Sequence, residues 1–294
     1  MSPVSPVSHR LLFIHAHPDD ESLTCGIAMA HHVARGDEVH VLTCTLGEEG
    51  EVIPPALSHL EGHPEDALGP HRYGELAEAL GRLGARMHVL GATPTTLSRY
   101  RDSGMAGSEA AGRDEAFVRA NLDEAARMVA GVIRHLRPHV VVTYDAQGGY
   151  GHPDHIQTHR VTRAALDLVE DDDLPERVFE IVTPRRWAIE DRRWLRANVR
   201  PEWGLTLLSD DDPYPPSVVR DEHVTHTVED PTARDAKNAA LRAHATQVLV
   251  LSDEVYALSN LVAARTTARE AFTRVDPRTW RRVGGDGIGQ SLTE

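Results

Sequence analysis

The chain has 294 residues, of which 40% are hydrophobic and 26% are charged, a composition typical of a globular protein with a large core. This length suits one large α/β domain, or one domain with a smaller appendage. The formal net charge of −14 repels phosphate backbones and anionic membranes, so we expect a small-molecule partner rather than nucleic acid or a membrane.

Strand and helix patterns alternate over the first part of the chain. Short apolar runs predict strands at 11–14, 38–45, 87–90 and 140–143. Amphipathic stretches predict helices at 22–35, 72–83, 118–136 and 156–169. Such alternation predicts an α/β fold with a Rossmann-like open, mostly parallel sheet and helices on both faces. Ligands of these sheets bind beyond the carboxyl ends of the strands.

Two long loops interrupt this pattern, at 46–70 and 92–115, and loops of such length are often functional. An acidic run at 171–173 ends the alternation. We therefore divide the chain into a Rossmann-like core at 10–170 and a C-terminal α/β continuation or cap at 171–294 that completes the pocket.

The C-terminal part has weaker patterns. A strand is predicted at 178–183 and a helix at 232–245, with a proline-rich loop at 212–216 between them. The glycine-rich segment at 285–289 has no helix after it, so we interpret it as a flexible tail rather than a dinucleotide-binding loop.

The cellular compartment follows from features that the chain lacks. Its two cysteines, Cys25 and Cys44, are too few for the disulfide framework of a secreted protein. Residues 1–9 show no signal-peptide pattern, and no stretch reaches the ~20 apolar residues of a membrane span. We therefore expect a cytoplasmic protein.

Two runs of imidazole and carboxylate side chains follow the first and fourth predicted strands. Residues 15–21 read His-Ala-His-Pro-Asp-Asp-Glu, and residues 150–155 read Tyr-Gly-His-Pro-Asp-His. Packing requires no such polar clusters, and carboxylates this close raise each other's pKa unless a cation neutralises them. A catalytic zinc takes three such ligands and keeps a fourth position open. His17 and Asp20 are close to each other in the sequence and His155 is distant from both. We predict that these three residues hold the metal.

The two runs resemble the LmbE-like, or PIG-L-like, family of zinc N-deacetylases. The resemblance is dense from residue 10 to about residue 165 and thins afterwards. Further segments are similar to the branch of this family that removes acetate from N-acetylglucosaminyl-inositol in mycothiol biosynthesis. These segments lie at 43–52, 101–107 and 243–247. The resemblance implies a metal-dependent hydrolase that cleaves the acetamide of this amino-sugar substrate.

The resemblance also implies roles for individual residues. His17, Asp20 and His155 would hold one Zn²⁺ per subunit, although Fe²⁺ or Co²⁺ suits the same ligands. Asp19 would be the general base that takes a proton from the attacking water. His152 would stabilise the oxyanion, and Tyr150 would help to polarise the carbonyl.

Residues in or beside the long loops would shape the sugar and inositol pocket. The family pattern implies this role for Arg72, Asp102 and Met105, with Glu51 near them. Asp154 is placed to orient a histidine from behind. Residues 171–200 diverge from the family pattern, and Gln147 replaces an expected asparagine, so substrate specificity is less defined than the chemistry.

Two other functions are compatible with the same sequence. One is mycothiol S-conjugate amidase, which uses the same metal site on a larger acyl group. The segments around Glu49 and Ser103 favour the deacetylase instead. The other is a metal- or sugar-binding protein without activity, against which Asp19 and His152 argue because binding alone needs no base.

Overall fold

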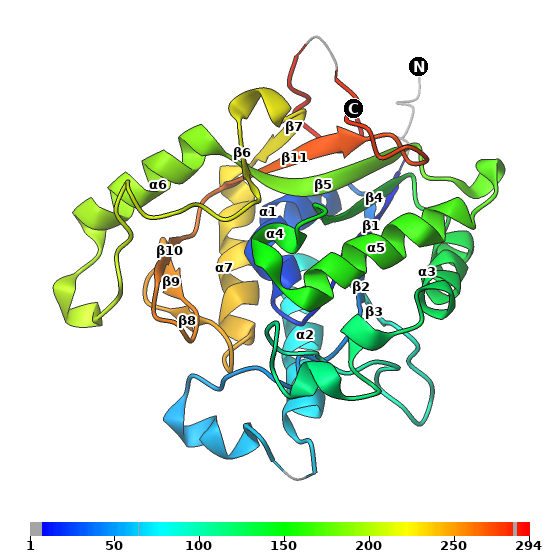
Figure 1. Ribbon diagram of the computed structural model, residues 1–294. Coiled ribbons are helices and arrows are strands. Elements are labelled where there is room, and N and C mark those ends of the chain that lie inside the picture. The colour runs from blue at the N-terminus through cyan, green and yellow to red at the C-terminus, as the bar shows by residue number, and fades with distance from the viewer. Residues whose placement is uncertain (1–7, 64, 285–286) are drawn as a thin grey trace.

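The computed structural model describes residues 8–63, 65–284 and 287–294 (Figure 1). Most of the N-terminal segment at 1–9 and two residues of the predicted tail at 285–289 therefore lie outside the described residues. The helices are α1 (Asp20–Ala34), α2 (Leu68–Leu83), α3 (Leu122–Leu136), α4 (Gly148–Gly151), α5 (Pro153–Asp167), α6 (Arg185–Asn198) and α7 (Arg234–Ala243). The strands are β1 (Arg10–His15), β2 (Glu38–Thr43), β3 (Arg86–Val89), β4 (Val140–Tyr144), β5 (Arg177–Pro184), β6 (Val218–Val219), β7 (His226–Glu229), β8 (Leu249–Val250), β9 (Val255–Ala257), β10 (Ala263–Arg265) and β11 (Arg269–Val275).

The central sheet has the order β3-β2-β1-β4-β5-β11-β7, and β6 pairs with β5. Strands β3 to β5 are parallel, as βαβ units require, whereas β11 runs antiparallel to both β5 and β7. The predicted α/β class with an open, mostly parallel sheet is confirmed.

Helices cover both faces of this sheet (Figure 1). On one face α1, α2 and α7 pack over side chains such as Phe13 of β1 and Phe179 of β5. On the other face α3 and α5 pack over Leu12, Ile14 and Val141. Alternate residues of each strand thus point into different cores, and both cores are fully buried. This explains why the central strands β1 and β4 carry continuous apolar runs rather than an alternating pattern.

Helices α3 and α5 begin at residues whose side chains cap them. Asn121 accepts a hydrogen bond from the backbone N–H of Glu124, so α3 begins at Leu122 and not at 118 as predicted. The residues before it form a short 3-10 turn at Phe117–Arg119. Helix α5 begins with Pro153 in its first turn, and His152 caps it by accepting the N–H of Asp154.

The last third of the chain extends the same sheet through β5, β11 and β7. Helix α6, which the sequence analysis did not predict, and a small sheet of β8, β9 and β10 lie to one side (Figure 1). Lys237 of α7 connects this region to the core. Its Nζ donates to Glu270 Oε1 (2.7 Å) and to the carbonyl of Leu23 in α1 (3.0 Å). The division of the chain near residue 170 stays a prediction.

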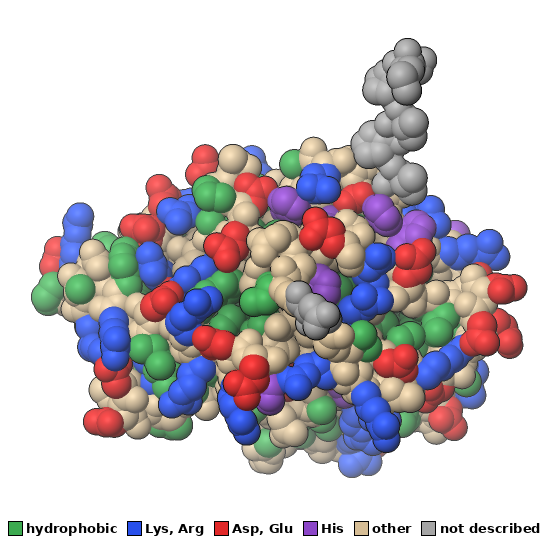
Figure 2. All heavy atoms as spheres, turned by 90° about the horizontal axis from the view of Figure 1, so that it is seen from above, with side chains coloured by type: hydrophobic (Ala, Val, Ile, Leu, Met, Phe, Trp, Pro, Cys, Tyr) green, Lys and Arg blue, Asp and Glu red, His purple; other side chains and the backbone are tan. Residues whose placement is uncertain are grey.

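None of the described helices is long and apolar enough to cross a membrane. Figure 2 shows arginine side chains interspersed with aspartate and glutamate over the face that it presents. The net negative charge is therefore not gathered into one patch on this face.

Candidate metal and catalytic site

The two polar runs meet at the point where the strand order of the sheet reverses. From β1 the chain proceeds to β2 and β3 on one side, and then returns to β4 on the other side of β1. The segments that follow β1 and β4 consequently leave the sheet side by side, which is where open α/β sheets bind ligands. His17 and His155, 138 residues apart, come into contact there.

Three atoms at this point are spaced as ligands of one small cation. His17 Nδ1 lies 3.5 Å from Asp20 Oδ2, and His155 Nε2 lies 3.3 Å from each of these atoms. Ligands of a tetrahedral zinc, about 2.0–2.1 Å from the ion, are separated by roughly 3.3–3.4 Å. All three side chains are buried. The donor set and its spacing therefore fit a zinc ion.

The other nitrogen of each histidine is occupied by the protein. His17 Nε2 lies 3.2 Å from Asp154 Oδ2, and His155 Nδ1 lies 3.2 Å from the carbonyl of Gly148. Asp154 is itself held by the backbone N–H and the hydroxyl of Ser103. With these nitrogens donating, His17 Nδ1 and His155 Nε2 keep free lone pairs toward Asp20, as metal-ligating histidines require.

The electrostatics of this cluster favour a positive charge. Burial alone would lower the pKa of His17, but the carboxylates of Asp102, Asp154 and Asp20 outweigh it and raise that pKa well above its ordinary value. His17 also forms groups of possible ligands with His152 and His155, and with Asp102 and Asp154, whose atoms lie within 4.8 Å of one another. The site could thus hold a metal ion.

Tyr144, at the end of β4, is a contributor that the sequence analysis missed. Its hydroxyl donates to Asp20 Oδ2 (2.8 Å) and accepts the backbone N–H of Ala16 (2.9 Å). It therefore connects the carboxylate to the turn after β1. No motif marks a tyrosine for this role, and only the pairing of β1 with β4 brings it there.

Asp19 has an unusual backbone conformation beside this cluster. Its φ of 120° lies in a region that non-glycine residues rarely adopt. Glu21 Oε2 accepts its backbone N–H (2.9 Å), and Arg72 Nη2 donates to its Oδ2 (3.1 Å). Glu21 is held in turn by His244 Nε2 at 2.7 Å. The strained turn is therefore fixed from both sides.

The pKa of Asp19 reflects these neighbours. Burial raises it to about 6, Arg72 opposes this rise, and the adjacent carboxylate of Asp20 adds to it. Asp19 Oδ1 has no hydrogen-bond partner among the described residues. The carboxylate is thus anchored through one oxygen and available through the other.

His152 and Tyr150 lie beside the same histidines. The ring centroid of His152 is 4.6 Å from that of His17, and the ring centroid of Tyr150 is 5.0 Å from that of His155. His152 Nδ1 accepts the N–H of Asp154, so its neutral ring carries the proton on Nε2. Burial and the nearby imidazoles of His17 and His155 lower the pKa of His152 to about 3, which keeps the ring neutral.

The four residues predicted to shape the sugar pocket lie in different environments. Arg72 is in α2 and only 3% exposed, and its guanidinium binds Asp19 and the carbonyls of Pro18 and Gly47. Asp102 is buried beside His17 Nε2, at 3.4 Å. Met105 is 56% exposed, and Glu51 is exposed on the surface loop. The structure thus brings Arg72 and Asp102 to the cluster, where the Nη atoms of Arg72 and the carboxylate of Asp102 are bound by the protein.

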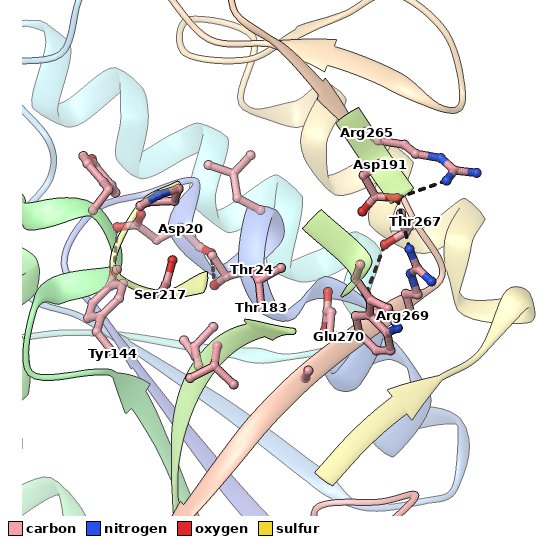
Figure 3. Close-up of a pocket in the computed structure, with 18 of the residues that line it drawn as sticks. Asp20, Thr24, Tyr144, Thr183, Asp191, Ser217, Arg265, Thr267, Arg269 and Glu270 are labelled. Atoms are coloured by element: carbon pink, nitrogen blue, oxygen red, sulfur yellow. Dashed lines mark hydrogen bonds and ion pairs between the residues drawn. The ribbon is translucent and has the colours of Figure 1, made fainter. Parts of the chain in front are cut away.

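A cavity of about 350 Å³ opens from the cluster (Figure 3). Asp20, Tyr144 and His155 line one end, with Tyr150 beside them. The cavity then passes between α1 and β5 and ends among side chains of α6, β9, β10 and β11, including Asp191 and Arg265. Its volume suits a ligand of two sugar-sized rings.

Comparisons with known proteins show which family the chain is similar to. Residues 12–166 match the model of the family described as "PIG-L: GlcNAc-PI de-N-acetylase". The chain is 48% identical over 275 residues to the 1D-myo-inositol 2-acetamido-2-deoxy-alpha-D-glucopyranoside deacetylase of Streptomyces griseus, covering 91% of this chain and 84% of the relative. It is 42% identical to the protein of the same name from Thermobifida fusca, covering 96% and 98%.

Solved structures show that the fold is shared more widely. A deacetylase of the teicoplanin biosynthesis pathway superposes with a TM-score of 0.53 at 19% identity, over 91% of this chain and 99% of that one. The 4-carboxy-2-hydroxymuconate hydratase of Pseudomonas putida KT2440 superposes with a TM-score of 0.52 at 19% identity, over 94% and 100%. Since a hydratase shares it, the fold alone does not define the reaction.

Proposed function

The chain belongs to the PIG-L family of GlcNAc-PI de-N-acetylases, and from this premise we propose that it removes the acetyl group of N-acetylglucosaminyl-inositol (1D-myo-inositol 2-acetamido-2-deoxy-alpha-D-glucopyranoside) in mycothiol biosynthesis. It is an amide hydrolase. The observation that carries the proposal is the three-atom set of His17, Asp20 and His155 beside a carboxylate, Asp19, with one free oxygen.

We propose that the ion at this site is zinc, held by His17 Nδ1, Asp20 Oδ2 and His155 Nε2. The spacing of these atoms and the imidazole and carboxylate chemistry support this choice, although Fe²⁺ and Co²⁺ accept the same ligands. Lewis acidity toward the acetamide carbonyl and the attacking water is the chemistry that such an ion would supply when bound.

Asp19 would then act as the general base. Its Oδ2 is tied to Arg72, so its free Oδ1 is the atom that would accept a proton from the water. A pKa near 6 leaves the group ionised at neutral pH, yet close enough to it for efficient proton transfer. The proton that it takes is then available to the leaving amine. Arg72, Glu21 and His244 would hold this carboxylate in its strained position.

His152 and Tyr150 would act on the carbonyl oxygen. The neutral ring of His152 carries its proton on Nε2, which can donate to the oxygen as negative charge develops there. Tyr150 is 55% exposed and lines the cavity beside Asp20 and His155, where its hydroxyl can reach a bound acetamide. Asp154 would orient His17, as its contact with Nε2 supports.

The substrate itself provides the test. Purified protein reconstituted with zinc should release acetate and a primary amine from N-acetylglucosaminyl-inositol. A mycothiol S-conjugate should be cleaved much more slowly in the same assay. Faster cleavage of the conjugate would assign the amidase activity instead, and release from neither compound would overturn the proposal.

We also propose that the enzyme works in the cytoplasm. Cys25 and Cys44 are both unpaired and buried, as expected where thiols stay reduced.

A further inference from the structure

The cavity reaches well beyond the candidate metal ligands. Figure 3 shows Asp20 and Tyr144 at one side and Asp191, Arg265 and Arg269 at the other. The far wall comes from residues 181–271, outside the segment at 12–166 that matches the family model. The part of the cavity that lies outside the matched segment is therefore the part farthest from the candidate metal ligands.

Two polar groups at the far end remain available to a ligand. Asp191 lines the cavity. Its Oδ1 accepts hydrogen bonds from Arg265 Nη1 (3.0 Å) and Arg269 Nη2 (3.1 Å). Its Oδ2 has no partner among the described residues. Tyr256 of β9 also lines the cavity, and its hydroxyl has no partner in the described part of the chain. Burial and the carboxylates of Asp191 and Asp19 raise the pKa of Tyr256 to about 12, so the hydroxyl keeps its proton.

The charges at this end are balanced within the protein. Arg265 pairs with Asp191, and Arg269 pairs with both Asp191 and Glu190 (2.9 Å). Nearer the middle, Lys237 pairs with Glu270. Each of these charges is thus paired with an opposite one among the described residues, so the wall offers no excess charge to recognise a phosphate or an amine. A fixed carboxylate oxygen and a phenolic hydroxyl instead suit a neutral ligand that carries several hydroxyl groups.

From this arrangement we infer that Asp191 and Tyr256 bind the hydroxyl groups of the substrate's second ring, the inositol. The inference rests on the proposed function, because it orients the substrate with its acetamide at Asp20 and His155 and its other ring toward β9 and α6. The inference also places recognition of that ring away from Arg72 and Asp102, because the Arg72 Nη atoms and the Asp102 carboxylate already contact Asp19, His17 and backbone groups.

The experiment compares two substrates on one variant. Tyr256→Phe keeps the ring and removes only the hydroxyl. Rates would be measured on N-acetylglucosaminyl-inositol and on the methyl glycoside of N-acetylglucosamine, which has no second ring. We expect kcat/KM to fall about 3–30-fold on the first substrate, since a buried hydroxyl of the substrate loses its partner. On the second substrate it should stay within about twofold of wild type, because the methyl glycoside makes no contact there.

Tyr100→Phe is the matched control, because Tyr100 is buried near Met128 and does not line this cavity. This variant should leave kcat/KM unchanged on both substrates. Asp191→Glu is a second variant, which keeps the charge facing both arginines and shifts the carboxylate oxygen. Like Tyr256→Phe, it should lower the ratio of kcat/KM for N-acetylglucosaminyl-inositol to kcat/KM for the methyl glycoside. If kcat/KM of Tyr256→Phe and Asp191→Glu fell equally on both substrates, or on neither, the inference would be overturned while the proposed function stood. A wild-type enzyme that releases no amine from either substrate would overturn both.

Discussion

Tyr144→Phe tests whether the candidate metal site depends on support from behind its ligands. The substitution removes one oxygen from a residue that is buried between β1 and α5. That oxygen donates to Asp20 Oδ2 and accepts the N–H of Ala16, so both partners lose a contact at once. The ring stack between Tyr144 and His155, with centroids 4.3 Å apart, would remain.

The size of the effect follows from these two contacts. An unpaired buried N–H costs about 1–3 kcal/mol, so the metal-free protein should lose roughly that much unfolding free energy. Loss of a hydrogen-bonding partner behind a metal ligand typically weakens metal affinity about 10–100-fold. Once zinc is saturating, kcat should change much less, because Tyr144 contacts neither Asp19 nor His152 through its hydroxyl.

Three measurements separate these effects. Denaturant unfolding of the metal-free protein gives the stability, competition with a chromogenic chelator gives the zinc affinity, and amine release at saturating zinc gives the rate. Tyr100→Phe, with its hydroxyl 4.0 Å from Met128 Sδ, controls for loss of a buried phenol oxygen elsewhere. Zinc affinity equal to wild type in Tyr144→Phe would refute the reasoning that Asp20 is a ligand held by this hydroxyl.

Other predictions test the remaining parts of the site and the fold. Chelation should abolish amine release, and added zinc should restore it. Metal analysis should find little zinc in His17→Ala, whereas His135→Ala, a change at an exposed histidine, should retain it. Asp19→Asn should lower kcat by roughly 10²–10⁴-fold with zinc content unchanged, and loss of zinc would instead make Asp19 a ligand. Burial, with the Asp145 carboxylate, raises the pKa of Glu180 from 4.5 to about 7, so the folded state retains a proton that the unfolded state releases, and stability is lost as pH rises through this window. Glu180→Gln should therefore raise the unfolding free energy by about 1–3 kcal/mol at pH 8 and change it little at pH 4, since one pKa unit is worth about 1.4 kcal/mol; equal effects at both pH values would contradict this account.

The parallel half of the fold was predictable because each strand there is a short apolar run next to an amphipathic helix. The predicted strand at 178–183 likewise matches β5 (Arg177–Pro184). Helix α6 escaped prediction because it is rich in arginine and buries only Trp187, Arg192 and Leu195. The antiparallel pairing of β11 with β5 and β7 was also missed, since no local signal specifies a partner that distant in the chain.

The candidate site was likewise predictable only in part. His17, Asp20 and His155 could be selected from sequence because the loops after β1 and β4 must meet where the strand order reverses. The approach of Asp102 to His17 depends on an irregular loop, which no periodicity describes. The burial of Arg72 was missed because α2 begins at Leu68, four residues before the predicted start. Its contact with Asp19 also needs the glycine at position 47, where a Cβ would lie 1.9 Å from Arg72 Nη1.

The buried ion pair of Lys237 and Glu270 has a practical consequence. Lys237 is the only lysine of the chain, and the fold encloses it between α1 and β11. A protease that cleaves only after lysine therefore has no accessible target in the native state and a single target in the unfolded chain. Cleavage should divide the molecule once, after residue 237, and only in molecules that have opened around α7. A brief pulse of such a protease would thus report the fraction of molecules that are open around α7, with two fragments of defined size as the readout.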